Sequence, residues 1–146
     1  MTSTRQRTIE LTLTRLIPAS PADVYDVWID PKSPGSPWFG VAKAIVQPVV
    51  DGLFYHLVHF EGHDWAHYGR FLTLDRPSRI AHTWISEATR GLESRVSLTF
   101  EPEADGTLVT LHHQNLPDDD MGRRHREGWG FLLDAIVARF GRPGRD

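Results

Sequence analysis

Hydrophobic and polar side chains alternate along residues 8–17, which read TIELTLTRLI. Ile9, Leu11 and Leu13 fall on one side of this alternation, and a glutamate and threonines fall on the other. A period of two residues places successive side chains on opposite faces of an extended chain, so the pattern predicts a β-strand. We expect this strand to end at Pro18.

Six further stretches rich in β-branched and aromatic residues also predict strands, and turn sequences separate them. The turns read VDG, EGHD, DRPS, ATRG and EADG. Because the stretches follow one another closely along the chain, we expect an antiparallel meander. The predicted strands span residues 41–47, 53–60, 65–74, 79–86, 93–102 and 107–114.

The stretch SPADVYDVWID predicts a helix after the first strand. Ser20 is suited to the N-cap, and Asp23 follows three residues later, as in a capping box. Val24, Val27 and Trp28 have the spacing of one helical face, so we expect these three side chains to be buried.

A loop and a long helix complete the predicted elements. PKSPGSPWFG holds three prolines and two glycines, which predicts a loop with one short turn of helix around Trp38. The final helix is expected to start at the aspartates 118–120, whose charge is favourable at a helix N-terminus, and to end at Gly141. Its apolar residues recur every three or four positions and form one face. They are Trp129, Leu132, Leu133, Ile136, Val137 and Phe140.

The order of these motifs resembles a known fold. TRLIPASPADVYDVWIDP, PWFG, DGLFYH, GRFLTLDRPSRIAHTW, VSLTFEPEADGTLVTLHH and HREGWGFLLDAI follow one another from about Ile9 to Phe140. As an ordered set they resemble the SRPBCC (START-like) superfamily and, within it, the family named after the activator of heat-shock protein 90 ATPase. The resemblance implies an α+β helix-grip fold. In this fold a curved antiparallel sheet of about seven strands wraps around a long C-terminal helix, and two short helices follow the first strand.

The same resemblance implies a single domain over residues 1–146, with its core at about 9–140 and short flexible termini. Superfamily members enclose a cavity between the sheet and the long helix. Most of their known roles are the binding, transport or conversion of apolar or aromatic small molecules. A hydrophobic small molecule is therefore the expected partner, and a homodimer and a chaperone contact are further expectations. No cofactor is expected.

Composition and charge exclude several classes of protein. The net charge is −3, and the basic run GRRHR lies beside acidic DDD, so we expect no nucleic-acid binding. The absence of cysteine excludes disulfides and thiolate catalysis, and it fits a reducing, cytoplasmic location. The N-terminal sequence has neither the pattern of a signal peptide nor that of a membrane span.

Four histidines lie in the stretch YHLVHFEGHDWAHYG. On a helix they would form a metal-binding stripe, but the aromatic and β-branched residues around them predict a hairpin instead. His56 then shares a strand face with Phe54, and His63 lies in the turn. If Glu61 to Asp64 form the loop, His67 lies opposite Val58 and on the face of His56. Two histidines lack a third fixed ligand, so no metal site is expected. The four are His56, His59, His63 and His67.

Three histidines are candidates for catalysis: His56, His82 and His113. His82 shares a strand face with Trp84, where it is either a hydrogen-bonded part of a packed wall or a ligand contact and general base. His113 matches a histidine common in the family at a strand end near the last helix. There it either ties the strand end to the helix by a hydrogen bond or forms part of a site.

Arg15 continues the inward phase of the first strand. An inward arginine could anchor a ligand carboxylate. Alternatively, it could pair with an acid such as Asp26, or extend to solvent.

The aromatic residues come from helices, loop and sheet, and in the helix-grip fold these elements converge. Together with the histidines they either fill the core or line an apolar pocket with a few polar groups. The candidate ligand-binding residues are Trp28, Trp38, Phe54, His56, Phe71, His82, Trp84, His113, Trp129 and Leu133.

Three functional hypotheses follow. The first is a binding protein for an apolar or aromatic small molecule, and the second is an enzyme of cyclase, hydrolase or isomerase type that uses the same cavity. The third is an interaction module in a chaperone or stress pathway. Binding predicts a closed cavity. Catalysis predicts a cavity-facing histidine with a perturbed pKa beside a second polar group. Interaction predicts a filled core and an exposed apolar patch.

Overall fold

The computed structural model describes residues 7–32, 36, 38 and 41–141, and in this part of the chain seven strands, two α-helices and one short 3-10 helix occur. All predicted strands are confirmed, with small differences at their ends. The elements are β1 (Thr8–Ile17), α1 (Pro21–Ile29), β2 (Lys43–Val46), β3 (Leu53–Phe60), β4 (His63–Asp75), β5 (Arg79–Ser86), η1 (Glu87–Thr89), β6 (Ser94–Glu103), β7 (Gly106–Pro117) and α2 (Asp120–Phe140).

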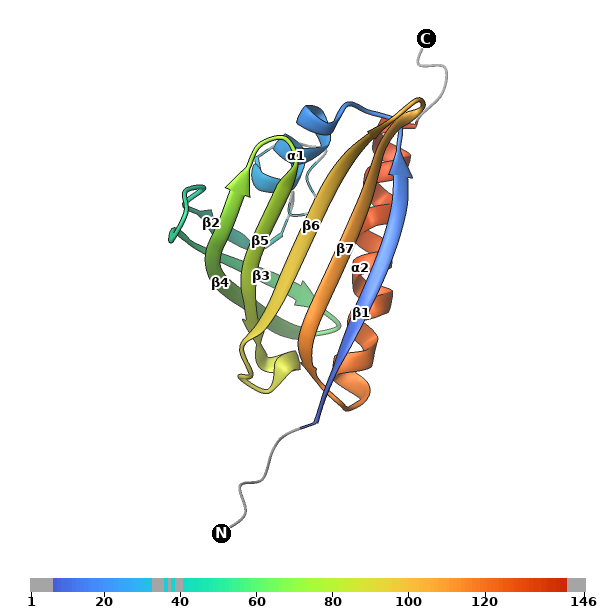
Figure 1. The fold of residues 1–146 in the computed structure, drawn as a ribbon. Coiled ribbons are helices and arrows are strands. Elements are labelled where there is room, and N and C mark those ends of the chain that lie inside the picture. The colour runs from blue at the N-terminus through green and yellow to red at the C-terminus, as the bar shows by residue number, and fades with distance from the viewer. Residues whose placement is uncertain (1–6, 33–35, 37, 39–40, 142–146) are drawn as a thin grey trace.

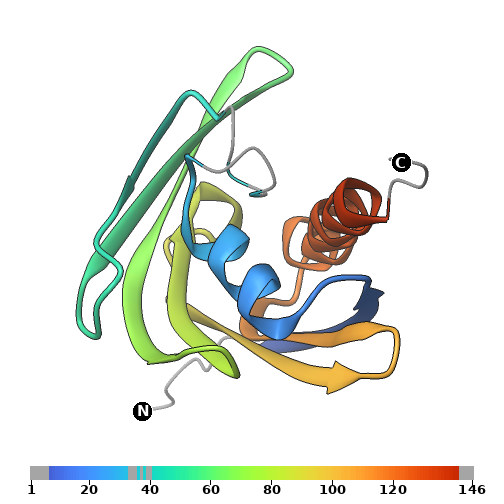
Figure 2. The same cartoon turned by 90° about the horizontal axis from the view of Figure 1, so that it is seen from above.

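The strands form one antiparallel sheet in the order β1-β7-β6-β5-β4-β3-β2. From β2 to β7 each strand pairs with the next along the chain, and β1 returns to pair with β7. The sheet is curved, and α1 and α2 lie on its concave side (Figures 1 and 2). This is the helix-grip arrangement expected from the resemblance.

Helix α1 begins as predicted, with the Ser20 hydroxyl accepting a hydrogen bond from the Asp23 backbone N–H at 3.2 Å. Its buried face differs from the prediction in one residue. Tyr25 is buried and packs edge-on against the Phe100 ring, whereas Val27 is only half-buried. The prediction failed there because α1 lies across the sheet with its Tyr25 side toward β6. The second short helix expected around Trp38 falls largely outside the described residues.

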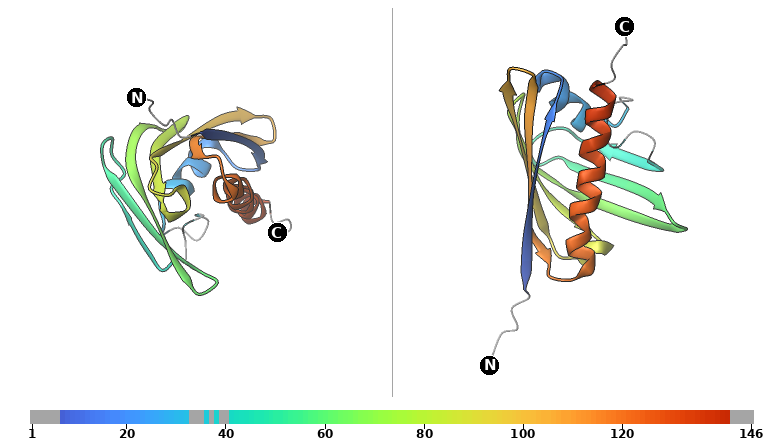
Figure 3. Two further views of the ribbon diagram at one scale, coloured as in Figure 1. Left: turned by 90° about the horizontal axis from the view of Figure 1, so that it is seen from below. Right: turned by 90° about the vertical axis from the view of Figure 1, so that its right-hand side faces the viewer.

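Helix α2 lies beside β1 along much of its length (Figure 3). It is capped by Asp119, whose Oδ1 accepts from the Gly122 N–H at 2.8 Å, and by Gly141, whose N–H donates to the Val137 carbonyl at 2.7 Å. Of its predicted apolar face, Trp129, Leu133 and Ile136 are buried, and the other three residues are half-buried at the flanks. Neither of the described α-helices is long and apolar enough to cross a membrane.

The β3–β4 hairpin is tighter than predicted. Its loop is Glu61 and Gly62 alone, with φ angles of 52° and 75°, as a type I′ turn requires. The expected four-residue loop was therefore wrong, and His63 belongs to β4 rather than to the turn. His67 consequently lies opposite His56, not opposite Val58. A register change of two residues keeps the same face, so the prediction that both histidines share one face is confirmed.

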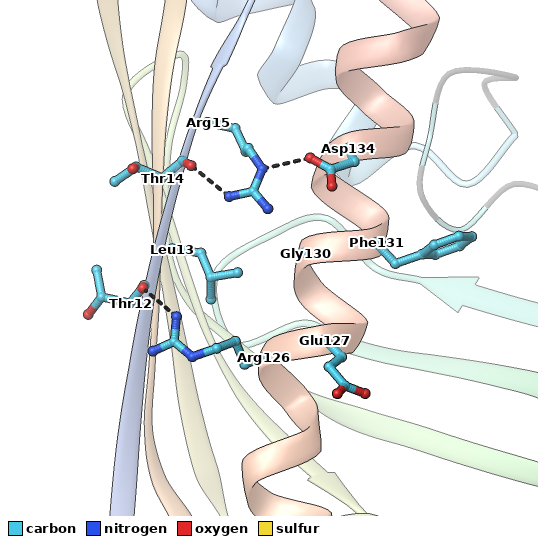
Figure 4. Close-up of a pocket in the computed structure, with 9 residues that line it drawn as sticks. All are labelled: Thr12, Leu13, Thr14, Arg15, Arg126, Glu127, Gly130, Phe131 and Asp134. Carbon is cyan, nitrogen blue, oxygen red and sulfur yellow. Dashed lines mark hydrogen bonds and ion pairs between the residues drawn. The ribbon is translucent and has the colours of Figure 1, made fainter.

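An open groove of about 580 Å³ lies between β1 and α2 (Figure 4). Arg15 does not pair with Asp26, which instead binds Arg76. Instead, the Arg15 Nε donates to Asp134 on α2 at 2.6 Å, because the inward end of β1 faces α2. Arg15 and Arg126 also donate to the carbonyls of Thr14 and Thr12, at 2.9 and 3.4 Å. These arginines shield the edge strand of the sheet.

Candidate functional site

The ten residues predicted to bind a ligand are brought together in the concave interior, and each is at most 5% exposed. They come from α1, β3, β4, β5, β7 and α2, and Trp38 comes from the connection between α1 and β2. Eight of them form one continuous set of rings in contact, which we call the aromatic cluster. Its members are Trp28, Trp38, Phe54, His56, Phe71, His82, Trp84 and Trp129.

Trp38 lies at the centre of the aromatic cluster. Its ring stacks on His56 with centroids 4.0 Å apart and planes 13° apart. It meets the rings of Trp28 and Trp129 edge-on, at 6.0 and 6.2 Å, and lies 5.9 Å from Trp84. A flat ring with one face stacked and two edge contacts has the geometry that aromatic side chains prefer.

The interior is filled in this conformation. The void bounded by the aromatic cluster is about 10 Å³, which is room for about one water molecule. Its walls include Trp38, His56 and His82. The enclosed cavity implied by the resemblance is not seen among the described residues, where the Trp38 indole lies among the rings at the centre. Of the three functional hypotheses, a filled core is the one expected for an interaction module.

His113 is held by a chain of hydrogen bonds. The Trp129 indole N–H donates to His113 Nδ1 at 2.9 Å, so the neutral ring has its proton on Nε2. Nε2–H in turn donates to Ser94 Oγ at 2.8 Å, and the Ser94 hydroxyl donates to the Trp84 carbonyl at 2.6 Å. Both ring nitrogens are thus occupied. This geometry supports the structural interpretation of His113, and we call these four groups the His113 relay.

In contrast to the nitrogens of His113, several buried side-chain nitrogens on β3, β4 and β5 are unbonded within the described residues. Four buried nitrogens there have no hydrogen-bond partner in the described part of the chain: Nδ1 and Nε2 of His56, Nδ1 of His67, and Nε1 of Trp84. His56 and His67 are directly opposite each other in the sheet, and the His67 ring stacks on Trp84 at 4.9 Å. The four atoms therefore belong to neighbouring side chains. We call them the unpaired nitrogens.

The hydrogen bonding of His82 is intermediate between that of His113 and that of His56. Its Nδ1 is 2.8 Å from the Thr83 carbonyl. A carbonyl can only accept, so Nδ1 bears the proton and Nε2 is the acceptor of the neutral ring. The ring packs edge-on against Phe54 and Phe71, at 4.8 and 5.9 Å.

Burial keeps these histidines uncharged. It lowers the pKa of His56 to about 3, with further lowering from charge on His82 and His67. It lowers the pKa of His67 and of His82 to about 4, and that of His113 well below its usual range. Removal from water disfavours the charged imidazolium. At neutral pH the interior therefore presents neutral rings.

No three side chains of the described residues converge in a way that could hold a metal ion. The other two histidines of the hairpin point to surface acids. His59 Nδ1 lies 2.6 Å from Asp64, and His63 Nε2 lies 2.8 Å from Glu87. The four-histidine stretch is thus divided between the interior and an exposed hairpin end.

Sequence reasoning missed two side chains near His113. Ser94 is in phase with buried Val96 on β6, which could have indicated its inward position. His125 packs edge-on against His113 at 5.2 Å. It precedes Trp129 by four residues on α2, a helical spacing that could have indicated the shared face.

Comparison with known proteins agrees with the fold. Structures of proteins from Chromobacterium violaceum, Rhizobium loti and Rhizobium leguminosarum superpose with TM-scores of 0.73, 0.79 and 0.77. Their identities to this chain are 23%, 20% and 19%. The similarity covers 90%, 92% and 94% of this chain and 96%, 99% and 97% of theirs. At these identities they share the fold alone, and the chain has no match among curated proteins.

The family is established by a direct match of the sequence. The family model described as "Activator of Hsp90 ATPase homolog 1-like protein" matches residues 18–141, which is most of the chain and includes the whole aromatic cluster. The expected SRPBCC (START-like) relationship is confirmed by this match and by the shared fold. The chain belongs to the family of Activator of Hsp90 ATPase homolog 1-like proteins.

Proposed function

We propose that this protein binds a neutral, planar aromatic small molecule within the aromatic cluster. The observation that supports this most directly is the group of unpaired nitrogens on His56, His67 and Trp84. A buried polar group without a partner costs about 1–3 kcal/mol. Four such atoms on adjacent side chains are a large local cost, and a ligand with polar atoms on its edge would remove it.

The chemistry of these nitrogens defines the ligand. The Trp84 indole N–H can only donate, so it requires an acceptor. A neutral imidazole offers one donor and one acceptor, so His56 accommodates either kind of group. The rings around them are flat and stacked, which favours a flat aromatic body over a branched aliphatic one. An aromatic amide, phenol or lactone has both features.

Charge restricts the ligand further. His56, His67 and His82 are neutral at pH 7 because burial lowers the pKa of each to about 3 or 4. The aromatic cluster as defined has no aspartate, glutamate, lysine or arginine side chain to pair with a ligand charge. Since burying an unpaired charge is far more costly than burying a neutral polar group, a carboxylate or ammonium ligand is disfavoured.

The same pKa shifts favour binding over acid–base catalysis. A general base is most effective when its pKa lies near the working pH. His56 and His82, with pKa values of about 3 and 4, are weak bases at neutral pH. The third catalytic candidate, His113, has both nitrogens engaged in its relay.

The proposal is tested with three molecules of one size. 2-Naphthamide is neutral, 2-naphthoate is anionic and 2-naphthylmethylammonium is cationic. We expect the amide to raise the melting temperature and to bind at least ten times more tightly than either ion, measured by thermal unfolding and calorimetry. His56→Phe keeps a flat ring but removes both nitrogens, so it should weaken amide binding about tenfold.

His59→Phe is the matched control, because it makes the same replacement at an exposed hairpin position. It should leave amide binding unchanged. Equal binding of the amide and the ions, or no binding of any of them, would contradict the proposal.

A second candidate function is protein interaction, which the family name suggests. The outer face of the sheet exposes Ile45 on β2, Leu53 on β3 and Tyr68 on β4, at 51%, 52% and 45%. If this face contacts an Hsp90-type chaperone, the chain should stimulate the ATPase rate of that chaperone. Tyr68→Lys should abolish the effect and leave naphthamide binding intact. An unchanged ATPase rate with the natural chain would contradict this candidate.

A further inference from the structure

Trp38 differs from every other ring of the aromatic cluster in where it comes from. The remaining seven rings belong to α1, β3, β4, β5 and α2, whereas Trp38 lies outside any helix or strand. We propose that the Trp38 indole occupies the ligand position itself, and that a ligand binds by replacing it. This inference rests on the proposed function and identifies where in the aromatic cluster the ligand lies.

The contacts of Trp38 are those expected for a bound aromatic molecule. One face lies on His56, with centroids 4.0 Å apart, and the edges of Trp28 and Trp129 surround it at 6.0 and 6.2 Å. The residue is only 5% exposed. A molecule in the place of this ring would touch four other aromatic rings, which is the enclosure that small-molecule sites provide.

The unpaired nitrogens lie around the same position. Trp38 stacks directly on the ring whose two nitrogens are both unpaired, and it lies 5.9 Å from Trp84, whose Nε1 is also unpaired. The indole therefore fills the space without satisfying these atoms. A ligand of similar shape that has an acceptor and a donor on its edge could satisfy them, so it could replace the indole with a gain in hydrogen bonding.

The backbone of Trp38 is held by local contacts. Its N–H donates to Ser36 Oγ at 3.1 Å, and its carbonyl accepts from the Val41 N–H at 3.3 Å. By contrast, Trp84 is paired with Ser94 within the sheet, and the Trp129 indole is bonded to His113 on another element. Within the described part of the chain, the hydrogen bonds of the sheet ladder, of α1 and α2 and of the His113 relay do not involve Trp38.

If the Trp38 indole occupies the ligand position, it lowers the affinity of the protein for a ligand by a measurable factor. A ligand that competes with an internal occupant binds with an affinity reduced by the fraction of molecules in which the site is free. Removing the Trp38 ring removes the competitor, so Trp38→Ala should bind 2-naphthamide at least tenfold more tightly than the natural chain. If Trp38 were instead a wall of the site, its removal would weaken binding.

The experiment combines calorimetry with ¹⁹F NMR of the 5-fluorotryptophan protein. Trp38→Phe identifies the Trp38 resonance by its loss. When the natural chain is saturated with 2-naphthamide, that resonance should move and acquire the solvent isotope shift of an exposed indole. The resonances of Trp28, Trp84 and Trp129 should remain buried. Trp65→Ala is the control, because it removes an equal ring outside the aromatic cluster, and it should leave the affinity unchanged.

The outcomes separate this inference from the proposed function. Binding by the natural chain with Trp38 still buried, or weaker binding by Trp38→Ala, would overturn this inference alone and leave the proposed function standing. Binding by Trp38→Ala only would identify Trp38 as a permanent part of the core and overturn both proposals. No binding by either protein would do the same.

Discussion

Two buried histidines in one interior have opposite hydrogen-bond environments. His113 is fully buried and both of its ring nitrogens are bonded, to Trp129 and Ser94. His56 is 4% exposed, and neither of its nitrogens has a partner in the part of the chain that the structure describes. Burial alone does not distinguish them, and neither does the direction of their pKa shifts. The difference lies in the partners, and it separates a structural histidine from a candidate ligand contact.

The two environments also differ in what they connect. The His113 relay runs from α2 through β7 and β6 to β5, so it ties the long helix to the centre of the sheet. His56 contacts Trp38, which belongs to a connection. Interactions that join regular elements stabilise the fold, whereas a polar group facing a replaceable ring is free to bind something else. The predictions below test this distinction.

Acid should produce the largest effect, and it should act on both environments. Burial lowers the folded-state pKa of His56 to about 3 and of His67 and His82 to about 4, against 6.5 in the unfolded chain. The unfolded chain therefore binds more protons below pH 6.5, so the stabilisation is present above that pH and is lost as the pH falls toward 4. Each of these three histidines should lower the free energy of unfolding by about 1.5 kcal/mol between pH 6.5 and pH 5.

Urea unfolding followed at pH 7, 6 and 5 measures this loss. His82→Phe removes one of the titrating groups. The number of protons taken up on unfolding, which sets the slope of the unfolding free energy against pH, should therefore fall by about one. A free energy of unfolding that stays constant from pH 7 to pH 5 would contradict the prediction.

Replacing His113 should be the most damaging of the single substitutions considered. His113→Phe keeps a ring of similar shape but leaves the Trp129 N–H without an acceptor and removes the donor to Ser94 Oγ, whose own hydroxyl still donates to the Trp84 carbonyl. One unpaired buried donor at about 1–3 kcal/mol and one further lost hydrogen bond at about 1 kcal/mol predict a destabilisation of about 3 kcal/mol. Urea unfolding at pH 7 provides the measurement, and a loss below about 1 kcal/mol would show that the relay is not structural.

A smaller effect is expected from shortening the same relay at Ser94. Ser94→Ala removes the acceptor of the His113 Nε2–H but keeps the bond between Trp129 and His113. One unpaired donor predicts a destabilisation of about 1–2 kcal/mol. Ser97→Ala on the same strand is the control, because Ser97 lies on the opposite face of β6, and it should change stability by less than about 0.5 kcal/mol. Equal effects of the two variants would contradict the relay.

Much of this fold follows from local patterns. Period-two alternation predicted that Phe54 and His56 share one strand face, and a spacing of three and four residues predicted the buried face of α2 at Trp129, Leu133 and Ile136. The register of the β3–β4 hairpin, by contrast, could not be predicted from local patterns. Glu61 adopts a positive φ angle that a non-glycine residue rarely takes, and nothing in the sequence around it indicates a two-residue loop rather than a four-residue one.

The candidate site was predictable only in part, for a physical reason. Strand phase predicted that His56 shares a face with Phe54 and that His82 shares one with Trp84, but it gives no information about partners from other elements. The bond between Trp129 and His113 joins a helix to a strand, and the stacking of Trp38 on His56 joins a connection to a strand. Which buried nitrogens lack partners depends on all these contacts together, so it could be established only from the structure.

The smallest effect should have the opposite sign, and it distinguishes the two environments most sharply. His56→Phe replaces a ring with two unpaired buried nitrogens by an apolar ring that can keep the stacking on Trp38. No partner is left unsatisfied, so the substitution should be neutral or stabilise the ligand-free protein by up to about 1 kcal/mol. The same change at His113 should cost about 3 kcal/mol, since that ring has partners to lose. Urea unfolding of the two variants side by side is the measurement.

If His56→Phe destabilises as strongly as His113→Phe, then His56 has hydrogen-bond partners in solution and the basis for a ligand contact at this position is removed. If His56→Phe stabilises the protein but weakens naphthamide binding, then His56 lowers the stability of the ligand-free protein and contributes to binding.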